Sequence, residues 1–302
     1  MSVRLGILCS GQGAQHPAMF ELASSDARVK GLLTHWRVPP LQGGADLFAN
    51  RVAQPMIVAA SCALWEAVRT RLPVPQLVAG YSVGELAALS VAGMLGAPAA
   101  IALARERARL MDACIDPAVP QGLLAVSGLA TERLAPLLQR SRLYLAIDNG
   151  ADQCIVGGTT VSLAALQAGV ANAGGRTQLL KVGIASHTPL MADAVAPLIR
   201  TMEQLTLLPP TIRILSGHSA QPVIDAEAAM TSLAAQLVQP VHWAGCMDAM
   251  AEAGITTALE LGPGNALARM LADRHPQIAC RSAADFRTLD GLASWVERAL
   301  GQ

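Results

Sequence analysis

The feature that most constrains how this chain can fold is a Gly-x-Ser-x-Gly pentapeptide at residues 80–84, set between an apolar run and a helical pattern. Residues 76–80 are typical of a short buried strand, and residues 86–95 of a helix. A strand, a tight turn and a helix in this order expose a serine hydroxyl, and the glycines leave room that Cβ atoms would fill. Two interpretations are open. Ser82 is a nucleophile, or it caps the helix together with Glu85 in a Ser-x-x-Glu capping box.

Composition favours a large, well-buried α/β protein. At 302 residues the chain is long enough for two domains, or for one domain that carries an insertion. Because 52% of the residues are apolar and only 15% are charged, we expect a sheet that is covered on both faces. A net charge of zero argues against nucleic acid as a partner.

Cysteine usage and hydropathy favour a cytoplasmic location. Six scattered cysteines without a Cys-x-x-Cys pair suit reduced thiols better than a disulfide framework or a zinc site, so we expect no bound metal. The apolar run at residues 5–9 is too short for a signal peptide, and no later run approaches the roughly 20 residues of a membrane span. We therefore expect a soluble, cytoplasmic protein without a membrane partner.

Residues 121–185 differ from the rest of the chain in the expected order of their strands and helices. The expected order there is strand, helix, strand, strand, helix, strand, which is the order of a ferredoxin-like unit. Asn149-Gly150 indicates a hairpin turn in the middle of this unit. Because α/β patterns lie on both sides, we interpret the unit as an insertion. Its expected strands are 122–128, 143–148, 153–156 and 177–184, and its expected helices are 131–140 and 161–173.

Outside this unit, strands and helices alternate. An alanine-rich helix at 53–72 has Pro55 near its start, and Thr188-Pro189 are placed like the N-cap and first turn of a helix that reaches about residue 205. Further strands are expected at 3–9, 211–216 and 258–261, and further helices at 97–114, 229–237 and 243–253.

A serine nucleophile needs a general base, and the chain has six histidines. His187 stands where a strand is expected to end and a helix to begin, a position from which a rigid scaffold presents catalytic side chains. The sequence therefore favours His187 as the base. The alternatives are His242, at a helix start, and the histidines of expected loops and turns, His16, His35, His218 and His275.

Acyl transfer also needs hydrogen-bond donors for an oxyanion. The backbone N–H of Val83, directly after the serine, is one expected donor. A second is expected from Gly11-Gln12-Gly13, whose glycines allow a backbone amide to approach a ligand closely. The alternative for this segment is an ordinary tight turn at the end of a strand.

Arg107 occupies an unusual place on its expected helix. At 100° per residue it falls within the apolar arc that contains Ile101, Ala104, Ala108 and Met111. An arginine on an apolar face needs an anionic partner, because an unpaired buried charge is costly. That partner is either an internal carboxylate or the carboxylate of a substrate held by the guanidinium fork.

Together, these motifs resemble the malonyl-CoA:acyl-carrier-protein transacylase family over essentially the whole chain. The resemblance implies an α/β-hydrolase-like large domain, residues 1–120 and 186–302, with an inserted ferredoxin-like small subdomain, residues 121–185. The matching motifs, in chain order, are Gly11-Gln-Gly-Ala-Gln15, Gly80-Tyr-Ser-Val-Gly-Glu85, Arg107-x-x-x-Met111, Asn149 ahead of Gln153-x-x-x-Gly157, Ser186-His187, Pro240-Val-His-Trp243 and Leu261-Gly-Pro-Gly264.

The resemblance also implies a role for each matching residue. Ser82 would carry the malonyl group as an ester. His187 would be its general base, oriented by the main-chain carbonyl of Gln236 rather than by an aspartate. The backbone N–H groups of Gln12 and Val83 would form the oxyanion hole. The residues that bind substrate would be Arg107, which would hold the malonyl carboxylate, and Gln12, Asn149 and Tyr81.

Two positions depart from the fatty-acid members of that family. Tyr81 stands where those members commonly have histidine, and Cys9-Ser10 stands where they have Phe-Pro. In these respects the chain looks more like the epsilon subunit of biotin-independent malonate decarboxylase. In that system the transacylase loads malonyl from malonyl-CoA onto a small carrier subunit that bears a phosphoribosyl-dephospho-CoA group.

The expected function is therefore ping-pong transfer of malonyl from malonyl-CoA, through a Ser82 ester, to a phosphopantetheine-type thiol. That thiol would belong to an acyl-carrier protein or to the carrier subunit of malonate decarboxylase, and no cofactor would be bound to this chain. The nearest alternative is a fatty-acid or polyketide malonyl transacylase. A serine hydrolase of acyl esters would use the same elbow but release the acid to water, and a scaffold subunit with an idle site would not become acylated.

Overall fold

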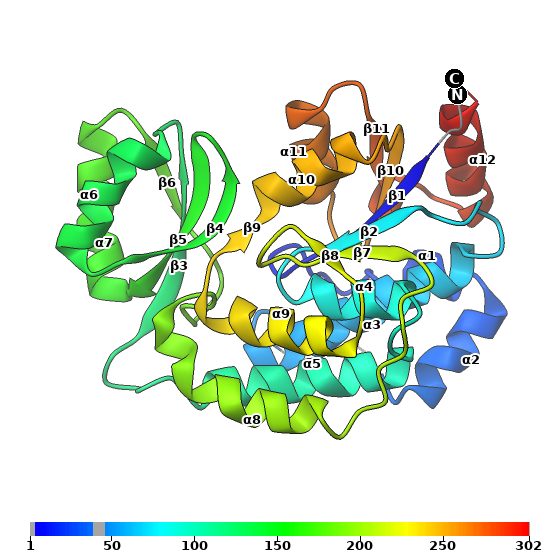
Figure 1. The fold of residues 1–302 in the computed structure, drawn as a ribbon, viewed down its shortest axis with the longest axis horizontal. Coiled ribbons are helices and arrows are strands. Elements are labelled where there is room, and N and C mark those ends of the chain that lie inside the picture. Colours follow the sequence, from blue (N-terminus) through cyan, green and yellow to red (C-terminus); the bar gives the residue numbers. More distant parts are fainter. Residues whose placement is uncertain (1–3, 39–45, 302) are drawn as a thin grey trace.

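The computed structural model describes residues 4–38 and 46–301, which form a mixed α/β fold with two sheets (Figure 1). Val3, the first residue of the expected N-terminal strand, lies outside the described residues. Within them, no helix is both long enough and apolar enough to cross a lipid bilayer.

The larger sheet has six strands in the order β11-β10-β1-β2-β7-β8. All neighbouring strands are parallel except β7 and β8, which are antiparallel. Every residue of β1, β2 and β10 is buried, as expected for central strands covered on both faces. The strands are β1 (Leu5–Cys9), β2 (Leu77–Gly80), β7 (Arg213–Leu215), β8 (Pro222–Val223), β10 (Thr257–Leu261) and β11 (Ala279–Ser282).

Helices cover both faces of this sheet, and the side chains of its strands alternate between two apolar clusters. Ile7 and Val78 belong to the cluster that includes α3, α4, α5, α8 and α9, whereas Leu8 and Leu77 belong to the cluster that includes α10 and α11. These helices are α3 (Asn50–Val68), α4 (Gly84–Val91), α5 (Ala97–Asp112), α8 (Ala192–Met202), α9 (Ala226–Val238), α10 (Trp243–Glu252) and α11 (Ala266–Arg274). Three further helices also contribute buried residues to the first cluster: α1 (Glu21–Ser24), α2 (Ala27–His35) and α12 (Leu289–Leu300).

The smaller sheet has the strand order β6-β3-β5-β4-β9. Its first four strands pair antiparallel, and two helices pack on it through their own apolar cluster. The order of elements between residues 121 and 179 is strand, helix, strand, strand, helix, strand, as the sequence predicted. They are β3 (Gln121–Ser127), α6 (Thr131–Ser141), β4 (Tyr144–Gly150), β5 (Gln153–Thr159), α7 (Thr160–Asn172) and β6 (Arg176–Leu179).

The fifth strand of the smaller sheet comes from a distant part of the chain. Strand β9 (Val241–His242) pairs parallel with β4, with Val241 opposite Ile147 and His242 opposite Asp148. This strand follows α9 of the large part and precedes α10 (Figure 1). The two sheets are therefore joined by backbone hydrogen bonds as well as by the connecting chain.

Several expected boundaries were wrong; for example, the helix expected at 86–95 is Gly84–Val91 and the strand expected at 153–156 is Gln153–Thr159. Strand β4 continues through Gly150, which pairs with Gln153, so the hairpin loop is residues 151–152 rather than Asn149-Gly150. Strand β6 ends at Leu179 instead of residue 184, because the chain leaves the sheet there and crosses toward the large part. Helix α3 spans 50–68 rather than 53–72. The expected cap at Thr188 is present: its side chain accepts a hydrogen bond from the N–H of Leu190, ahead of a single 3₁₀ turn and α8.

Candidate active site

The Gly-x-Ser-x-Gly segment forms a sharp turn between β2 and α4. Ser82 has φ +55°, a left-handed conformation that is uncommon for a residue with a side chain. A Cβ on Gly80 would lie 2.3 Å from the backbone N of Glu85, and one on Gly84 would lie 2.2 Å from the backbone O of Cys9. Both glycines are therefore required by direct backbone contact, as the elbow interpretation demands.

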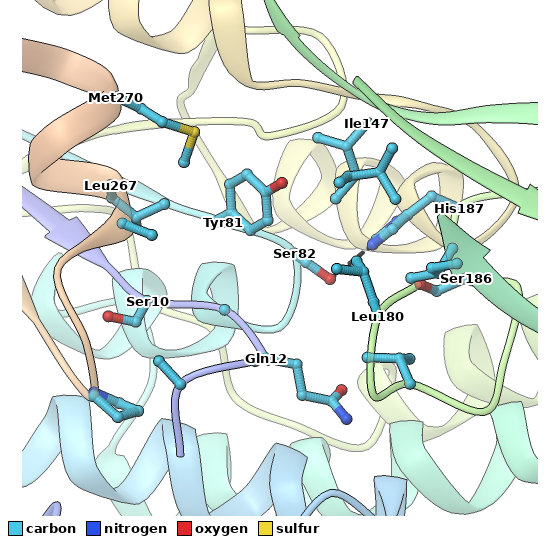
Figure 2. A pocket seen from close by; sticks show the side chains of 18 of the residues that line it. Ser10, Gln12, Tyr81, Ser82, Ile147, Leu180, Ser186, His187, Leu267 and Met270 are labelled. Carbon is cyan, nitrogen blue, oxygen red and sulfur yellow. Dashed lines mark hydrogen bonds between the residues drawn. The ribbon is translucent and has the colours of Figure 1, made fainter. Parts of the chain in front are cut away.

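The capping-box interpretation of Ser82 and Glu85 is wrong. Helix α4 has no side-chain hydrogen bond at its N-cap, and the residue in the cap position is Val83. The Ser82 side chain points instead toward a histidine. The hydroxyl oxygen of Ser82 lies 2.7 Å from Nε2 of His187 (Figure 2).

His187 is held on its other side by a main-chain carbonyl. Its Nδ1 lies 2.5 Å from the backbone O of Gln236. A carbonyl oxygen can only accept a hydrogen bond, so Nδ1 must carry the proton and the neutral ring leaves Nε2 free to accept one from Ser82. The contact with Gln236 thus fixes the tautomer that a general base needs.

The carbonyl of Gln236 is available because of its neighbour in the sequence. Gln236 lies in the last turn of α9, where its carbonyl would ordinarily accept the backbone N–H of the residue four positions later. That residue is Pro240, which has no N–H. The proline therefore leaves an unpaired helix carbonyl, and His187 donates to it.

The environment of His187 keeps the imidazole neutral. Burial and, to a smaller extent, the nearby charge of Arg107 lower the pKa of His187 to about 3, although the hydrogen bond to Gln236 acts in the opposite direction. His187 is 1% exposed. None of the other histidines lines the cavity beside Ser82; His275, for example, contacts Asp248 at 2.8 Å instead.

The two backbone N–H groups predicted as oxyanion donors belong to residues near Ser82: Val83 follows it directly in the sequence, and Gln12 lines the same cavity. Among the hydrogen bonds of residues 4–38 and 46–301, neither the N–H of Val83 nor that of Gln12 has a protein acceptor. Gly11 is needed here because a Cβ would lie 2.7 Å from the Tyr81 ring and from its carbonyl oxygen. The side-chain amide nitrogen of Gln12 is buried and also lacks a hydrogen-bond partner in the described part of the chain.

A cavity of about 310 Å³ opens beside Ser82 and is enclosed by both sheets (Figure 2). Its walls are mostly apolar, and its polar groups are concentrated at the ends of β1, β2 and β10. From the smaller sheet and the segment that follows it come Leu123, Ile147, Ile155, Leu180, Val182, Ser186 and His187; from the larger part come Ser10, Gly11, Gln12, Gly13, Ala14, Tyr81, Ser82, Glu260, Pro263, Ala266, Leu267 and Met270.

Arg107 is buried on the apolar face of α5, as predicted, but it does not line this cavity. Its Nη1 donates to Oε1 of Gln54 at 2.7 Å, and its Nη2 donates to Oε1 of Gln236 at 3.3 Å. Both partners are neutral amides, and Arg107 takes part in no ion pair of the described residues. Burial lowers the pKa of Arg107 to about 10, while the charge of Glu85 partly opposes this effect. Arg107 is still a cation at neutral pH.

Gln54 is a residue that the sequence analysis missed. It lies in α3, and its Nε2 donates to the side-chain oxygen of Asn50 at 2.6 Å while its Oε1 receives the hydrogen bond from Arg107. Both Gln54 and Asn50 are buried. Two amide side chains one turn apart lie on the same face of this alanine-rich helix. That spacing was the sequence pattern from which a buried polar contact could have been predicted.

A hydrogen bond joins Tyr81, at the cavity wall, to Asn149. The phenol of Tyr81 donates to Oδ1 of Asn149 at 3.1 Å, and the edge of its ring meets Trp243 with the ring centroids 5.3 Å apart. Tyr81 lines the cavity, whereas Asn149 does not. Burial raises the pKa of Tyr81, so it remains a neutral hydrogen-bond donor.

Comparison with known proteins gives consistent matches. Residues 41–288 match the acyl transferase domain family. The malonyl CoA-acyl carrier protein transacylase of Mycobacterium tuberculosis is 30% identical over 303 residues, covering 96% of this chain and 99% of that protein. Polyketide synthase GfsB of Streptomyces halstedii is 32% identical over 291 residues, which are 90% of this chain and 5% of that protein. The crystal structure of MCAT from Mycobacterium tuberculosis has a TM-score of 0.87 at 30% identity, covering 96% of this chain and 99% of that one.

Proposed function

This chain belongs to the acyl transferase domain family, and on that premise we propose that it transfers malonyl groups from malonyl-CoA to the thiol of a carrier protein. The observation that supports this most directly is the 2.7 Å contact between Ser82 and a His187 whose tautomer is set by the Gln236 carbonyl. The similar transacylase from Mycobacterium tuberculosis carries malonyl CoA and acyl carrier protein in its name. Ser82 and His187 form the catalytic dyad of this proposal.

The proposed reaction runs in two matching halves. Ser82 Oγ attacks the thioester carbonyl of malonyl-CoA while its proton passes to Nε2 of His187. The N–H groups of Val83 and Gln12 donate to the oxyanion that forms. The carbon–sulfur bond then breaks, the CoA sulfur takes the proton from His187, and malonyl remains as an ester on Ser82. A carrier thiol repeats these steps in reverse.

Arg107 provides malonyl specificity in this proposal. Its guanidinium has five N–H donors, and two are used by Gln54 and Gln236. A malonyl carboxylate would bring the anionic partner that the neutral amides do not supply. Because Arg107 does not line the cavity, the carboxylate reaches it only if neighbouring side chains shift. Tyr81 and Asn149 complete the substrate site.

Intact-mass measurement after exposure to malonyl-CoA tests the function. We expect the mass of the protein to increase by one malonyl group, with no increase in Ser82→Ala, and to return to its original value when a carrier thiol is added. A protein that releases malonate to water as fast as it consumes malonyl-CoA would be a serine hydrolase. A protein that neither gains mass nor consumes malonyl-CoA would be a scaffold subunit.

The carrier is proposed to be the small subunit of a malonate decarboxylase. Tyr81 and Cys9-Ser10, which replace residues common in fatty-acid members, support this. In the structure Ser10 donates to Glu260 at 3.0 Å, a hydrogen bond that proline could not make. The second candidate, a fatty-acid or polyketide transacylase, is favoured by the names of the relatives. Transfer rates to holo acyl-carrier protein and to a carrier bearing phosphoribosyl-dephospho-CoA distinguish the two.

The domain division and location are proposed as the sequence suggested. Residues 1–120 and 186–302 would be the α/β-hydrolase-like domain and residues 121–185 the ferredoxin-like subdomain, which the strand order of the smaller sheet supports. A cytoplasmic location remains a prediction, as does the absence of any bound cofactor or metal.

A further inference from the structure

Glu85 is a buried carboxylate that the proposed reaction does not use. It is 1% exposed and lies in the first turn of α4, three residues after Ser82. Its Oε2 accepts hydrogen bonds from the backbone N–H of Gly217 at 2.9 Å and from Nε2 of Gln236 at 2.5 Å. Its Oε1 accepts one from the hydroxyl of Ser232 at 2.9 Å. The carboxylate therefore binds α4 to α9 and to the loop that follows β7.

Gln236 connects this carboxylate to the dyad. Its side-chain amide donates to Glu85 and accepts from Arg107, so a carboxylate and a guanidinium face its two ends. Turning the amide over would place its NH₂ against the guanidinium and its oxygen against the carboxylate. The two charges thus permit only one orientation of the Gln236 side chain. The backbone carbonyl of the same residue receives Nδ1–H of His187.

The backbone around Glu85 is shaped to admit it. A Cβ on Gly217 would lie 2.8 Å from Oε2 of Glu85 and 3.2 Å from Nε2 of Gln236. Glycine at this position lets the main-chain N–H reach the carboxylate. Ser232 is itself fixed by the hydroxyl of Ser216 at 2.5 Å. Both carboxylate oxygens of Glu85 thus accept hydrogen bonds from donors that are themselves buried or fixed by further hydrogen bonds.

Neither helix capping nor packing explains why a carboxylate with three hydrogen-bonding partners would be buried at residue 85. Burying a carboxylate is costly unless its hydrogen bonds are met, and an apolar side chain would fill the same space without that cost. Burial raises the pKa of Glu85 to about 7, and the hydrogen bonds from Ser232 and Gly217 and the charge of Arg107 oppose that rise. The carboxylate is placed where it can order Gln236, which contacts both His187 and Arg107.

We propose that Glu85 is a positioning residue: it holds Gln236 so that the main-chain carbonyl keeps His187 aligned with Ser82 and the side-chain amide keeps Arg107 in place. This inference rests on the Ser82–His187 dyad proposed above. It assigns a role to the last residue of the Gly80–Glu85 motif, whose first residues form the turn itself.

A neutral fluorophosphonate, which labels an activated serine and has no carboxylate for Arg107, reports on the dyad separately from malonyl specificity. The full-length protein is compared with Glu85→Ala, Glu85→Gln, Gln236→Ala and Gly217→Ala, and the rate of Ser82 labelling is followed by intact mass. Thr257→Val is the control. The buried hydroxyl of Thr257 has no hydrogen-bond partner among the described residues, and it lies at the end of β10 that is far from Glu260 and the cavity.

We expect Glu85→Ala to label about tenfold more slowly than the natural protein, as for the loss of a buried charged hydrogen bond. Glu85→Gln can still accept from Gly217 and Gln236, so its rate should return to within about threefold. Glu85→Ala combined with Gln236→Ala should be no slower than the slower single variant, because both act through one contact. Gly217→Ala should slow labelling although residue 85 is still glutamate, because the added Cβ would meet Oε2 of Glu85. Thr257→Val should label at the natural rate.

Labelling of Glu85→Ala at the natural rate would overturn the inference. It would also be overturned if the fold-decrease in the double variant equalled the product of the fold-decreases in the two single variants. If Glu85→Ala does not fold, natural rates in both Gln236→Ala and Gly217→Ala would overturn it. Malonyl-CoA separates the two proposals. A natural protein that reacts with fluorophosphonate in the expected variant pattern but gains no malonyl would refute malonyl transfer and leave the role of Glu85 intact.

Discussion

Ser82 and His187 both adopt left-handed backbone conformations, with φ values of +55° and +62°. Neither is glycine, and such a conformation costs about 1–3 kcal/mol for a residue with a side chain. The surrounding structure maintains both: the elbow glycines admit close backbone contacts at Ser82, and the Gln236 carbonyl and Ser82 hold the ring of His187. The two reacting atoms are thus brought together by strained backbone on two separate segments.

Arg107→Ala should change which acyl group Ser82 accepts. Loss of a desolvated charged contact costs about 2–5 kcal/mol, so we expect the malonyl labelling rate to fall by at least an order of magnitude while acetyl labelling from acetyl-CoA persists or increases. The ratio of the two rates, measured by intact mass, checks this. Glu106→Gln, a change to a partly exposed residue of the same helix, is the matched control. An unchanged malonyl preference in Arg107→Ala would refute the role of Arg107.

The lowered pKa of His187 predicts an unusual pH profile. Because that pKa is about 3, the imidazole stays neutral well below the ordinary histidine pKa of about 6.5. The base is lost only as the pH falls toward the lower value. Glu85, whose pKa burial raises to about 7, does titrate in this range, and its protonation should change the rate no more than Glu85→Gln does. Labelling of Ser82 by a neutral fluorophosphonate should therefore stay within about threefold between about pH 5 and 8. Rates measured across this range check the prediction. A decline of about tenfold or more with a midpoint near 6.5 would contradict it.

At the scale of the element, the elbow depends on Gly84. A Cβ there would meet the backbone O of Cys9, which no side-chain movement relieves. We expect Gly84→Ala to lower the free energy of unfolding by about 3 kcal/mol or more. Gly31, within α2, has nothing within 4 Å of an added Cβ, so Gly31→Ala should stabilise by roughly 0.5–1 kcal/mol. Urea unfolding measures both. Equal effects of the two substitutions would show that the contact at Gly84 is unimportant.

Elements with strong local signals were predictable from the sequence. The elbow, the order of elements between 121 and 179 and the burial of Arg107 all follow from periodicity and glycine placement within short windows. Strand β9 was not predictable, because two residues become a strand only through their partner β4. The Gln54 contact and the Gln236–Glu85 contact were missed for the same reason, since each joins segments far apart in the chain.

At the scale of the whole molecule, the smaller sheet completes both the cavity and the core. Removing residues 124–179 and joining Leu123 to Leu180 by a Gly-Ser linker is feasible, because the N–H of Leu180 already donates to the carbonyl of Leu123 at 2.9 Å. The product would lack Ile147 and Ile155 from the cavity wall and would leave the buried Val241 without its partner strand. We expect it to retain helical circular dichroism, to bind an apolar dye and to lose malonyl labelling. Malonyl labelling at the natural rate would contradict this.

Strand β9 has a practical consequence for building chimeric acyltransferases. The chain runs directly from Gln236, which orients the base, through Pro240 to the edge of the smaller sheet. A foreign insert grafted between residues 121 and 185 must therefore offer Val241 and His242 a matching strand edge at the register of Ile147 and Asp148. An insert with the right cavity walls but the wrong edge would displace the chain at Val241, and the resulting loss of rate would arise at His187 rather than at the new specificity pocket.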